Sequence, residues 1–161
     1  MSLRAFGDWL YGTSLSTSIR EVDWLIPAVQ SVHILAIAIL VGSTLVSDLR
    51  LAGVFATDET PAAVVRRYLP WMWGALLVLL LTGLTMVLAE PGRTITNAVF
   101  WTKMALVVTA FALTLLFRKP VLDQQFRLEH AAWARSAKPL AWLSLGMWVA
   151  VIFCGRWIAY T

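Results

Sequence analysis

A histidine lies deep inside the first long apolar run of the chain, where ionisable side chains are rare. His33 follows Trp24 by nine residues, which corresponds to roughly 14 Å along an α-helix. An imidazole at that depth can coordinate a haem iron or another metal, or relay protons, because neutral histidine is the commonest ligand of this kind. The alternative is a purely structural hydrogen bond to a neighbouring helix.

A lysine opens the third apolar run and shares a helical face with Ala110 and Thr114. The side chain of Lys103 can snorkel to the headgroups, or it can turn inward toward His33 and pair with a porphyrin propionate or another anion. The sequence leaves both readings open. A charged residue at the centre of a membrane helix costs about 2.5–3.5 kcal/mol on insertion scales, so either reading requires stabilising surroundings.

Two further residues are candidates for a haem site. Met86, or Met104, could supply a second axial ligand of the thioether type, although such a methionine is more often core filler. Arg50 lies at the end of the first apolar run and could clamp a propionate or a substrate carboxylate. The alternative for Arg50 is a local pair with Asp48 or a contact with lipid phosphate.

Other site types find little support. The second histidine, His130, lies in the connection of residues 118–138, which we expect to be far from His33, so two histidines on one haem are not predicted. Cys154 is the only cysteine, which excludes an internal disulfide and a cysteine cage for a metal. Nucleophile elbows and phosphate-binding glycine loops are absent from the sequence. No catalytic residue is therefore assigned.

The first apolar run carries a polar seam. Projected at about 100° per residue, its polar side chains fall within one sector, whereas Leu35, Ile39 and Val46 point elsewhere. We expect this seam to face the interior of a helical bundle. It consists of Gln30, His33, Thr44, Ser47 and Asp48.

Composition defines the elements that must position these residues. Of 161 residues, 60% are hydrophobic and 14% are charged, and the mean hydropathy is +0.75. Four segments have the roughly 20 apolar residues needed to cross a bilayer. The prediction is an all-α integral membrane protein, a four-transmembrane-helix bundle forming a single domain over residues 1–161. The expected spans are residues 24–45, 68–89, 98–117 and 140–160.

The N-terminal segment has an amphipathic pattern. Apolar residues recur at helical spacing beside Arg4 and Asp8, which predicts a short interfacial helix on the membrane surface; a frayed amphipathic tail is the alternative. The first 20 residues contain no continuous apolar core, so a cleaved signal peptide is not expected. The apolar positions are Leu3, Phe6, Leu10 and Tyr11.

The basic residues are distributed unevenly between the two sides. Four spans put both termini and the turn of residues 90–97 on one side with four cations, against eight on the other. The positive-inside rule then predicts a multi-pass protein of the bacterial inner (cytoplasmic) membrane with both termini periplasmic. The net charge of +4 favours lipid headgroups over nucleic acid as the partner. The four are Arg4, Arg20, Arg93 and Arg156; the eight are Arg50, Arg66, Arg67, Arg118, Lys119, Arg127, Arg135 and Lys138.

The long connection after the third span is basic as well. Residues 118–138 are enough for a helical turn or two on the cytoplasmic surface. Leu122, Phe126 and Trp133 could anchor that turn in the interface.

Short motifs in this order resemble known membrane proteins. Trp24 to Pro27, His33, Asp48 to Leu51 and Phe100 to Lys103 are similar to elements of uncharacterised bacterial four-helix membrane proteins. More distantly, the chain resembles HemJ-type proteins (protoporphyrinogen oxidases) and CopD-type membrane proteins. The HemJ resemblance implies b-type haem bound through His33, with Arg50 and Lys103 at positions of basic residues in that family. HemJ-type proteins carry further histidines, whereas residues 51–57 and 104–117 contain none.

The leading hypothesis is a haem b-binding redox protein with His33 as the iron ligand and Lys103, Arg50 and Met86 as further cofactor-binding candidates. The alternative is a non-enzymatic small-solute transport or accessory protein. The expected partners of the protein are the lipid bilayer and either a second copy of the chain or a membrane redox partner. A third reading is purely structural. Small residues that would allow close helix packing are Gly42, Ser43, Gly74, Gly83, Gly146 and Gly155.

Overall fold

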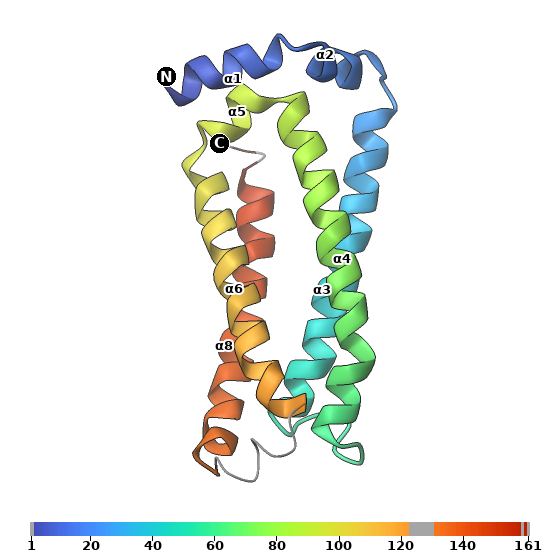
Figure 1. The fold of residues 1–161 in the computed structure, drawn as a ribbon, viewed down its shortest axis with the longest axis vertical. Coiled ribbons are helices and arrows are strands. Elements are labelled where there is room, and N and C mark those ends of the chain that lie inside the picture. The colour runs from blue at the N-terminus through green and yellow to red at the C-terminus, as the bar shows by residue number, and fades with distance from the viewer. Residues whose placement is uncertain (1, 123–130, 159, 161) are drawn as a thin grey trace.

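Four long helices run up and down as a bundle in the computed structural model, which describes residues 2–122, 131–158 and 160 (Figure 1). They are α3 (Leu25–Leu51), α4 (Pro61–Ala89), α6 (Ala98–Leu122) and α8 (Ala131–Trp157). Each contains a stretch long and apolar enough to cross a membrane. The described residues contain no strand. The chain is therefore a multi-pass membrane protein, and the predicted all-α fold with four spans is confirmed.

The helices extend beyond the predicted spans, mainly at one end of the bundle. Helix α3 continues to Leu51, six residues past the expected limit of 45. Helix α4 begins at Pro61, where the Thr60 hydroxyl accepts a hydrogen bond from the Ala63 amide at 3.3 Å. A threonine N-cap followed by proline in the first turn is a strong helix start, and it lies seven residues before the first residue, 68, of the predicted span.

The connection between the third and fourth spans is shorter than predicted. Helix α6 continues to Leu122 and α8 begins at Ala131, so most of the expected surface turn belongs to the two long helices. Phe126 and His130 lie outside the described residues.

Three short helices gather at one end of the bundle (Figure 1). Helix α1 (Leu3–Tyr11) and α2 (Ser14–Glu21) precede the first span, and α5 (Pro91–Ile95) joins α4 to α6. The C-terminus lies at the same end, which we call the termini end. The opposite end, where residues 52–60 join α3 to α4, is the loop end. The interfacial helix was predicted, whereas α2 and α5 were not.

Polar contacts hold α1 and α2 against the bundle. The Ser16 hydroxyl is fully buried and donates to the Leu88 carbonyl at 2.7 Å. Arg20 donates to the same hydroxyl, and its guanidinium lies 3.6 Å from the centre of the Tyr11 ring. Leu3, Phe6 and Trp9 of α1 remain exposed, as expected of a helix whose apolar face lies in the membrane interface.

The long helices form a four-membered ring in the order α3, α4, α6, α8. Helix α3 packs most extensively on α4, and helix α6 packs most extensively on α8. Smaller contacts of α3 with α8 and of α4 with α6 close the ring. Large apolar side chains such as Leu35, Leu80 and Phe153 cover the outer surface, where lipid is their natural solvent. The apolar core at mid-height contains Leu40, Met72, Ala75, Ala110, Trp148 and Val151.

Candidate functional site

His33 lies in the termini-end half of α3 and is half-buried against α4. Its Nδ1 is 2.6 Å from the Thr82 hydroxyl oxygen, and that hydroxyl is 2.7 Å from the Val78 carbonyl oxygen. A threonine hydroxyl has one proton, and the Val78 carbonyl can only accept it. When the Thr82 proton goes to the Val78 carbonyl, as that 2.7 Å bond indicates, Thr82 accepts from His33 Nδ1 and the lone pair of the imidazole is on Nε2.

A glycine keeps one edge of this imidazole uncovered. Gly83 follows Thr82 in α4, and a Cβ atom added to it would lie 3.8 Å from His33 Cε1. A side chain at this position would therefore begin in van der Waals contact with the ring. Glycine at this position leaves space beside the histidine that a larger residue would fill.

Lys103 of α6 turns into the bundle. A Cβ atom added to Gly155 of α8 would lie 3.3 Å from Lys103 Nζ and 3.5 Å from its Cε, so the lysine side chain lies across this glycine. Its ammonium group is close enough to interact electrostatically with His33 and Cys154. The lysine is thus turned inward, and its pairing with an anion stays a prediction.

His33, Thr82, Lys103 and the two glycines form one group, which we call the termini-end cluster. Its members come from α3, α4, α6 and α8, so all four spans contribute. Met86 is half-buried on α4, one helical turn beyond Thr82 toward the termini end.

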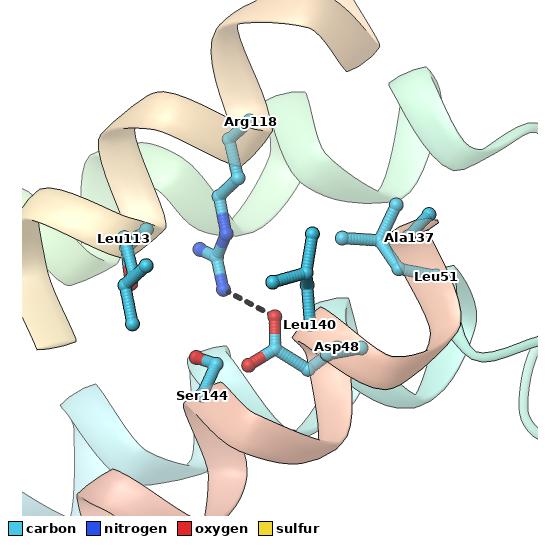
Figure 2. Close-up of a pocket in the computed structure, with 9 residues that line it drawn as sticks. Asp48, Leu51, Leu113, Arg118, Ala137, Leu140 and Ser144 are labelled. Carbon is cyan, nitrogen blue, oxygen red and sulfur yellow. Dashed lines mark hydrogen bonds and ion pairs between the residues drawn. The ribbon is translucent and has the colours of Figure 1, made fainter. Parts of the chain in front are cut away.

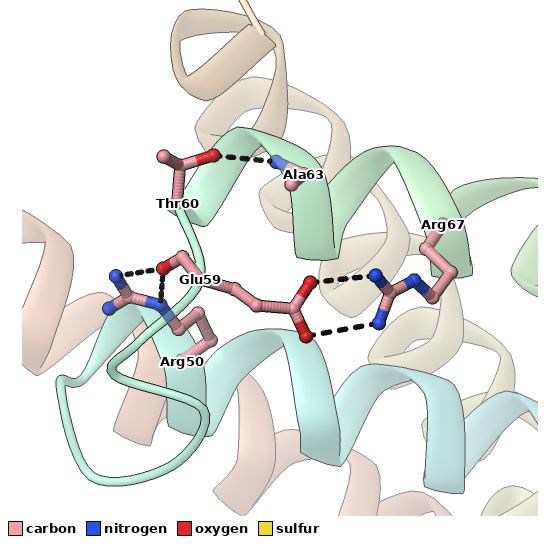
Figure 3. A network of polar contacts seen from close by, with 5 residues as sticks. All are labelled: Arg50, Glu59, Thr60, Ala63 and Arg67. Atoms are coloured by element: carbon pink, nitrogen blue, oxygen red, sulfur yellow. Dashed lines mark hydrogen bonds and ion pairs between the residues drawn. The ribbon is translucent and has the colours of Figure 1, made fainter.

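Arg50 does not belong to this cluster. It is 17 residues further along α3 than His33, or about 25 Å, at the loop end. Its Nε donates to the Glu59 carbonyl at 2.7 Å, and the Glu59 carboxylate pairs with Arg67 at 2.6 and 3.1 Å (Figure 3). Arg50 thus closes the loop between α3 and α4, and the expectation that it shares a ligand with His33 is not met.

A second polar cluster lies inside the loop end of the bundle. Arg118 Nη2 of α6 is 3.0 Å from Asp48 Oδ1 of α3, and the two side chains are only 3% and 4% exposed (Figure 2). Arg118 also donates to the Met72 sulfur of α4. Ser144 of α8 points toward the Asp48 carboxylate. We call Asp48, Arg118 and Ser144 the loop-end cluster.

From the sequence, Arg118 was expected among the charges of the connection, and Asp48 was expected in the polar seam or as a local partner of Arg50. A signal for the buried pair was present. Arg118 continues the face of Ala110 and Thr114 at intervals of four residues, and Asp48 belongs to the predicted seam of α3. An arginine in register with a buried face, opposite an acidic group in another seam, predicts an ion pair between helices.

The seam of α3 faces the interior along most of its length. Thr44, Ser47 and Asp48 are buried, as predicted, and His33 is half-buried, but Gln30 is exposed. About 22 Å of helix separates His33 from Asp48. Leu40, Ala110 and Val151 of the apolar core lie between the two clusters, so the polar interior is divided by an apolar layer.

The described residues contain no group of three or more His, Cys, Asp or Glu side chains that could hold a metal ion. A bare zinc site needs three or four protein ligands. Haem differs because the porphyrin supplies four nitrogens and the protein one or two axial ligands. A single histidine therefore fits haem better than it fits a bare metal ion.

Residues 22–161 match DUF6644, a family of unknown function. The chain belongs to this family. The DUF6644 match covers all four spans and both polar clusters, and it begins just after α2. No curated protein and no solved structure matches the chain significantly. The comparisons bear out an uncharacterised family and show no likeness to HemJ-type or CopD-type proteins.

Proposed function

We propose that this chain is a redox protein that binds one haem b through His33 at the termini end of the bundle. The observation that carries the proposal is the hydrogen-bond chain from His33 Nδ1 through Thr82 to the Val78 carbonyl. In the tautomer that donates from Nδ1 to Thr82, the Nε2 lone pair can bind iron, and a histidine whose other nitrogen donates to a fixed partner is the usual arrangement in metal ligation.

The surroundings of His33 fit a porphyrin in charge. Lys103 brings a cation into the same part of the bundle, where it can pair with a propionate. Gly83 places no side chain against the imidazole, and the lysine lies across Gly155. Met86 is the candidate for a second axial ligand. Haem bound here would supply one-electron redox chemistry, and we assign no catalytic residue to the chain.

Haem titration of the detergent-purified protein tests this proposal. We expect a Soret band at one haem per chain, and we expect His33→Ala to abolish it. His130→Ala is the matched control because it removes the only other histidine. Absence of haem uptake by the unmodified protein would rule out the proposal. Haem uptake that survives His33→Ala with an unchanged spectrum would show that another residue is the iron ligand.

A second candidate function is transport of a small polar solute, with the chain acting alone or as an accessory to a partner. The observation that favours it is the division of the polar interior into two clusters by an apolar layer, as in a pathway closed at its middle. Solute flux in proteoliposomes should then depend on Lys103 and Arg118. Flux that is unchanged by both Lys103→Gln and Arg118→Gln would argue against this candidate.

We also propose an inner-membrane location with the termini end on the periplasmic side. The supporting observation is the imbalance of basic residues between the two sides, which persists when the buried Arg118 is left out of the count. Arg118 is buried in an ion pair, so seven of the eight cations remain on the loop-end side against four on the termini side. The positive-inside rule still puts the loop end in the cytoplasm.

A further inference from the structure

Four buried polar atoms have no hydrogen-bond partner among the described residues. They are Thr44 Oγ1, Asp48 Oδ2, Ser144 Oγ and Trp148 Nε1. The first two are one turn apart on α3, and the other two are one turn apart on α8, which packs on α3. Buried polar groups in proteins are nearly always paired with protein or with ordered water. The Ser144 hydroxyl faces the Asp48 carboxylate (Figure 2), and water at this stretch of the α3–α8 interface would satisfy the remaining hydrogen-bonding capacity of these groups.

A cavity lies where two of these atoms meet. It has a volume of about 10 Å³ and is lined by Asp48, Arg118, Thr114 and Ser144 together with apolar residues (Figure 2). That is close to the space that one water molecule needs, and a buried water typically makes about three hydrogen bonds. A water here can donate to Asp48 Oδ2 and bond to Ser144 Oγ.

The cavity is near the loop end, and apolar core residues lie between it and the other end. Its apolar walls include Leu51 in the last turn of α3, and Ala137 and Leu140 in the first turns of the span of α8. Toward the termini end, the apolar layer of Leu40, Ala110 and Val151 separates it from His33. Water can thus reach Asp48 from the loop end more directly than from the termini end.

The charge on Asp48 is balanced by one cation. Arg118 contacts it from α6, α4 contributes the uncharged Met72, and α8 contributes the uncharged Ser144. Among the residues whose side chains the structure describes, the other charged groups at this end are engaged elsewhere or lie outside the cavity lining. Arg50 and Arg67 bind Glu59, and Lys138 lies beside Gly53. Asp48 therefore faces one arginine and a water-sized space.

We propose that Asp48 is a proton-binding site that exchanges protons with the loop-end side through the cavity water. In the exchange, an O–H bond of a hydronium ion breaks, its proton bonds to Asp48 Oδ2, and a water molecule remains. The carboxylate becomes a neutral carboxyl group while Arg118 keeps its charge. This site lies in the opposite half of the bundle from the proposed haem ligand and does not depend on it.

Protonation of Asp48 has a mechanical consequence. Helices α3 and α6 are diagonal in the ring and make no direct backbone packing contact within the described residues. The Asp48–Arg118 ion pair connects them across the interior. Neutralising Asp48 removes the charge attraction from this link, so proton binding would loosen the bundle at the loop end.

Infrared difference spectroscopy of the purified protein during a pH titration tests the proposal. We expect a reversible carbonyl-stretch band of a protonated carboxyl group that shifts in D₂O. Asp48→Asn should abolish the band, and Asp58→Asn, which changes an exposed loop carboxyl, should retain it. A band that survives Asp48→Asn, or its absence in the unmodified protein, would overturn the proposal.

Two further measurements keep the proposal testable if Asp48→Asn does not fold. Ser144→Ala should shift the midpoint of the band's titration because it removes a partner of the water, whereas the exposed Ser31→Ala should not. In proteoliposomes given an external pH jump, the responding fraction should equal the fraction of molecules with the loop end outside. That fraction is measured by labelling Asp58→Cys in a Cys154→Ser background. A response from the oppositely oriented molecules would contradict access from the loop end.

Discussion

Thr82 holds one nitrogen of His33 in a hydrogen bond. When its own proton goes to the Val78 carbonyl one turn earlier, its hydroxyl accepts from Nδ1. A threonine inside a helix commonly makes such a bond to its own backbone. In that tautomer the lone pair of His33 is on Nε2.

Replacing Thr82 should therefore weaken haem binding without removing the ligand. We expect Thr82→Val to lower haem affinity by roughly 10–100-fold, the usual effect of losing the partner that orients a metal ligand. Thr85→Val is the matched control, because Thr85 bonds only to the Leu81 carbonyl of its own helix. Equal haem titration curves for the two variants would show that Thr82 does not position His33.

The Asp48–Arg118 pair should show a strongly non-additive response. Removing one partner of a buried ion pair typically costs about 3–5 kcal/mol, because the other charge is left unpaired. We expect Arg118→Gln to destabilise the protein by that order, and Asp48→Asn with Arg118→Gln to restore part of the loss. Unfolding of the detergent-solubilised protein in a double-mutant cycle measures the coupling.

The exposed Glu59–Arg67 pair is the control for this cycle. Its side chains are 33% and 56% exposed, and exposed pairs contribute about 0–1 kcal/mol. Arg67→Gln should therefore change stability little. If Arg118→Gln lowers the free energy of unfolding no more than Arg67→Gln does, that result would contradict a buried and unscreened interior pair.

At the scale of the helices, apolar length was the reliable signal. The four long apolar runs predicted the four spans, because a run of roughly 20 apolar residues matches the thickness of the hydrocarbon core of a bilayer. Helix ends were predicted less well. Ser47, Asp48 and Arg50 look like the water-facing end of a span, but they lie inside the continued helix α3. Ser47 donates to the Ser43 carbonyl, Asp48 pairs with Arg118 through Oδ1, and Arg50 donates to the Glu59 carbonyl.

The candidate site was predictable in its residues more than in its geometry. His33 and Lys103 stand out as costly groups in apolar runs, yet only the packing of α6 on α8 decides that Lys103 crosses Gly155 instead of snorkelling. Arg118 was missed because an arginine just past an apolar run is indistinguishable by composition from a loop charge. Helix α2 was missed because Ser14–Glu21 has little apolar character and is held by the contacts of Ser16 and Arg20.

The two glycines of α8 offer a test of the inward lysine. Gly155→Ala puts a methyl group 3.3 Å from Lys103 Nζ, whereas nothing lies within 4 Å of a Cβ atom at Gly146. We expect Gly155→Ala to move the flexible ammonium group and weaken haem binding, and Gly146→Ala to leave haem binding unchanged. Identical haem affinities for the two variants would show that Lys103 does not contribute to haem binding.

The attachment of α2 to the bundle depends on one buried hydroxyl. Ser16→Ala removes the bond to the Leu88 carbonyl and leaves Arg20 with one partner fewer, which should cost about 1 kcal/mol. Limited proteolysis between α1 and the first span should then become faster. Ser18→Ala, at an exposed position of the same helix, should cleave at the unmodified rate, and equal rates for both variants would exclude the anchoring role.

For the whole molecule, the charge imbalance predicts an orientation that can be measured in cells. In a Cys154→Ser background, Asp8→Cys should react with a membrane-impermeant thiol reagent added from the periplasm. Asp58→Cys should react only after the inner membrane is permeabilised. Both positions are exposed in the structure, so accessibility reports the side and not burial. The reverse pattern would contradict a periplasmic termini end.

The ring of helices also consists of two hairpins. Helix α3 packs most on α4 beside a loop fastened by Arg50, Glu59 and Arg67, and α6 packs most on α8. The first hairpin carries Asp48 in its apolar environment, and the second carries Arg118. Each hairpin alone would leave one charge uncompensated in the bilayer. Assembly of the bundle is then a neutralisation, in which the later-synthesised half of the chain brings the counter-charge that the earlier half lacks.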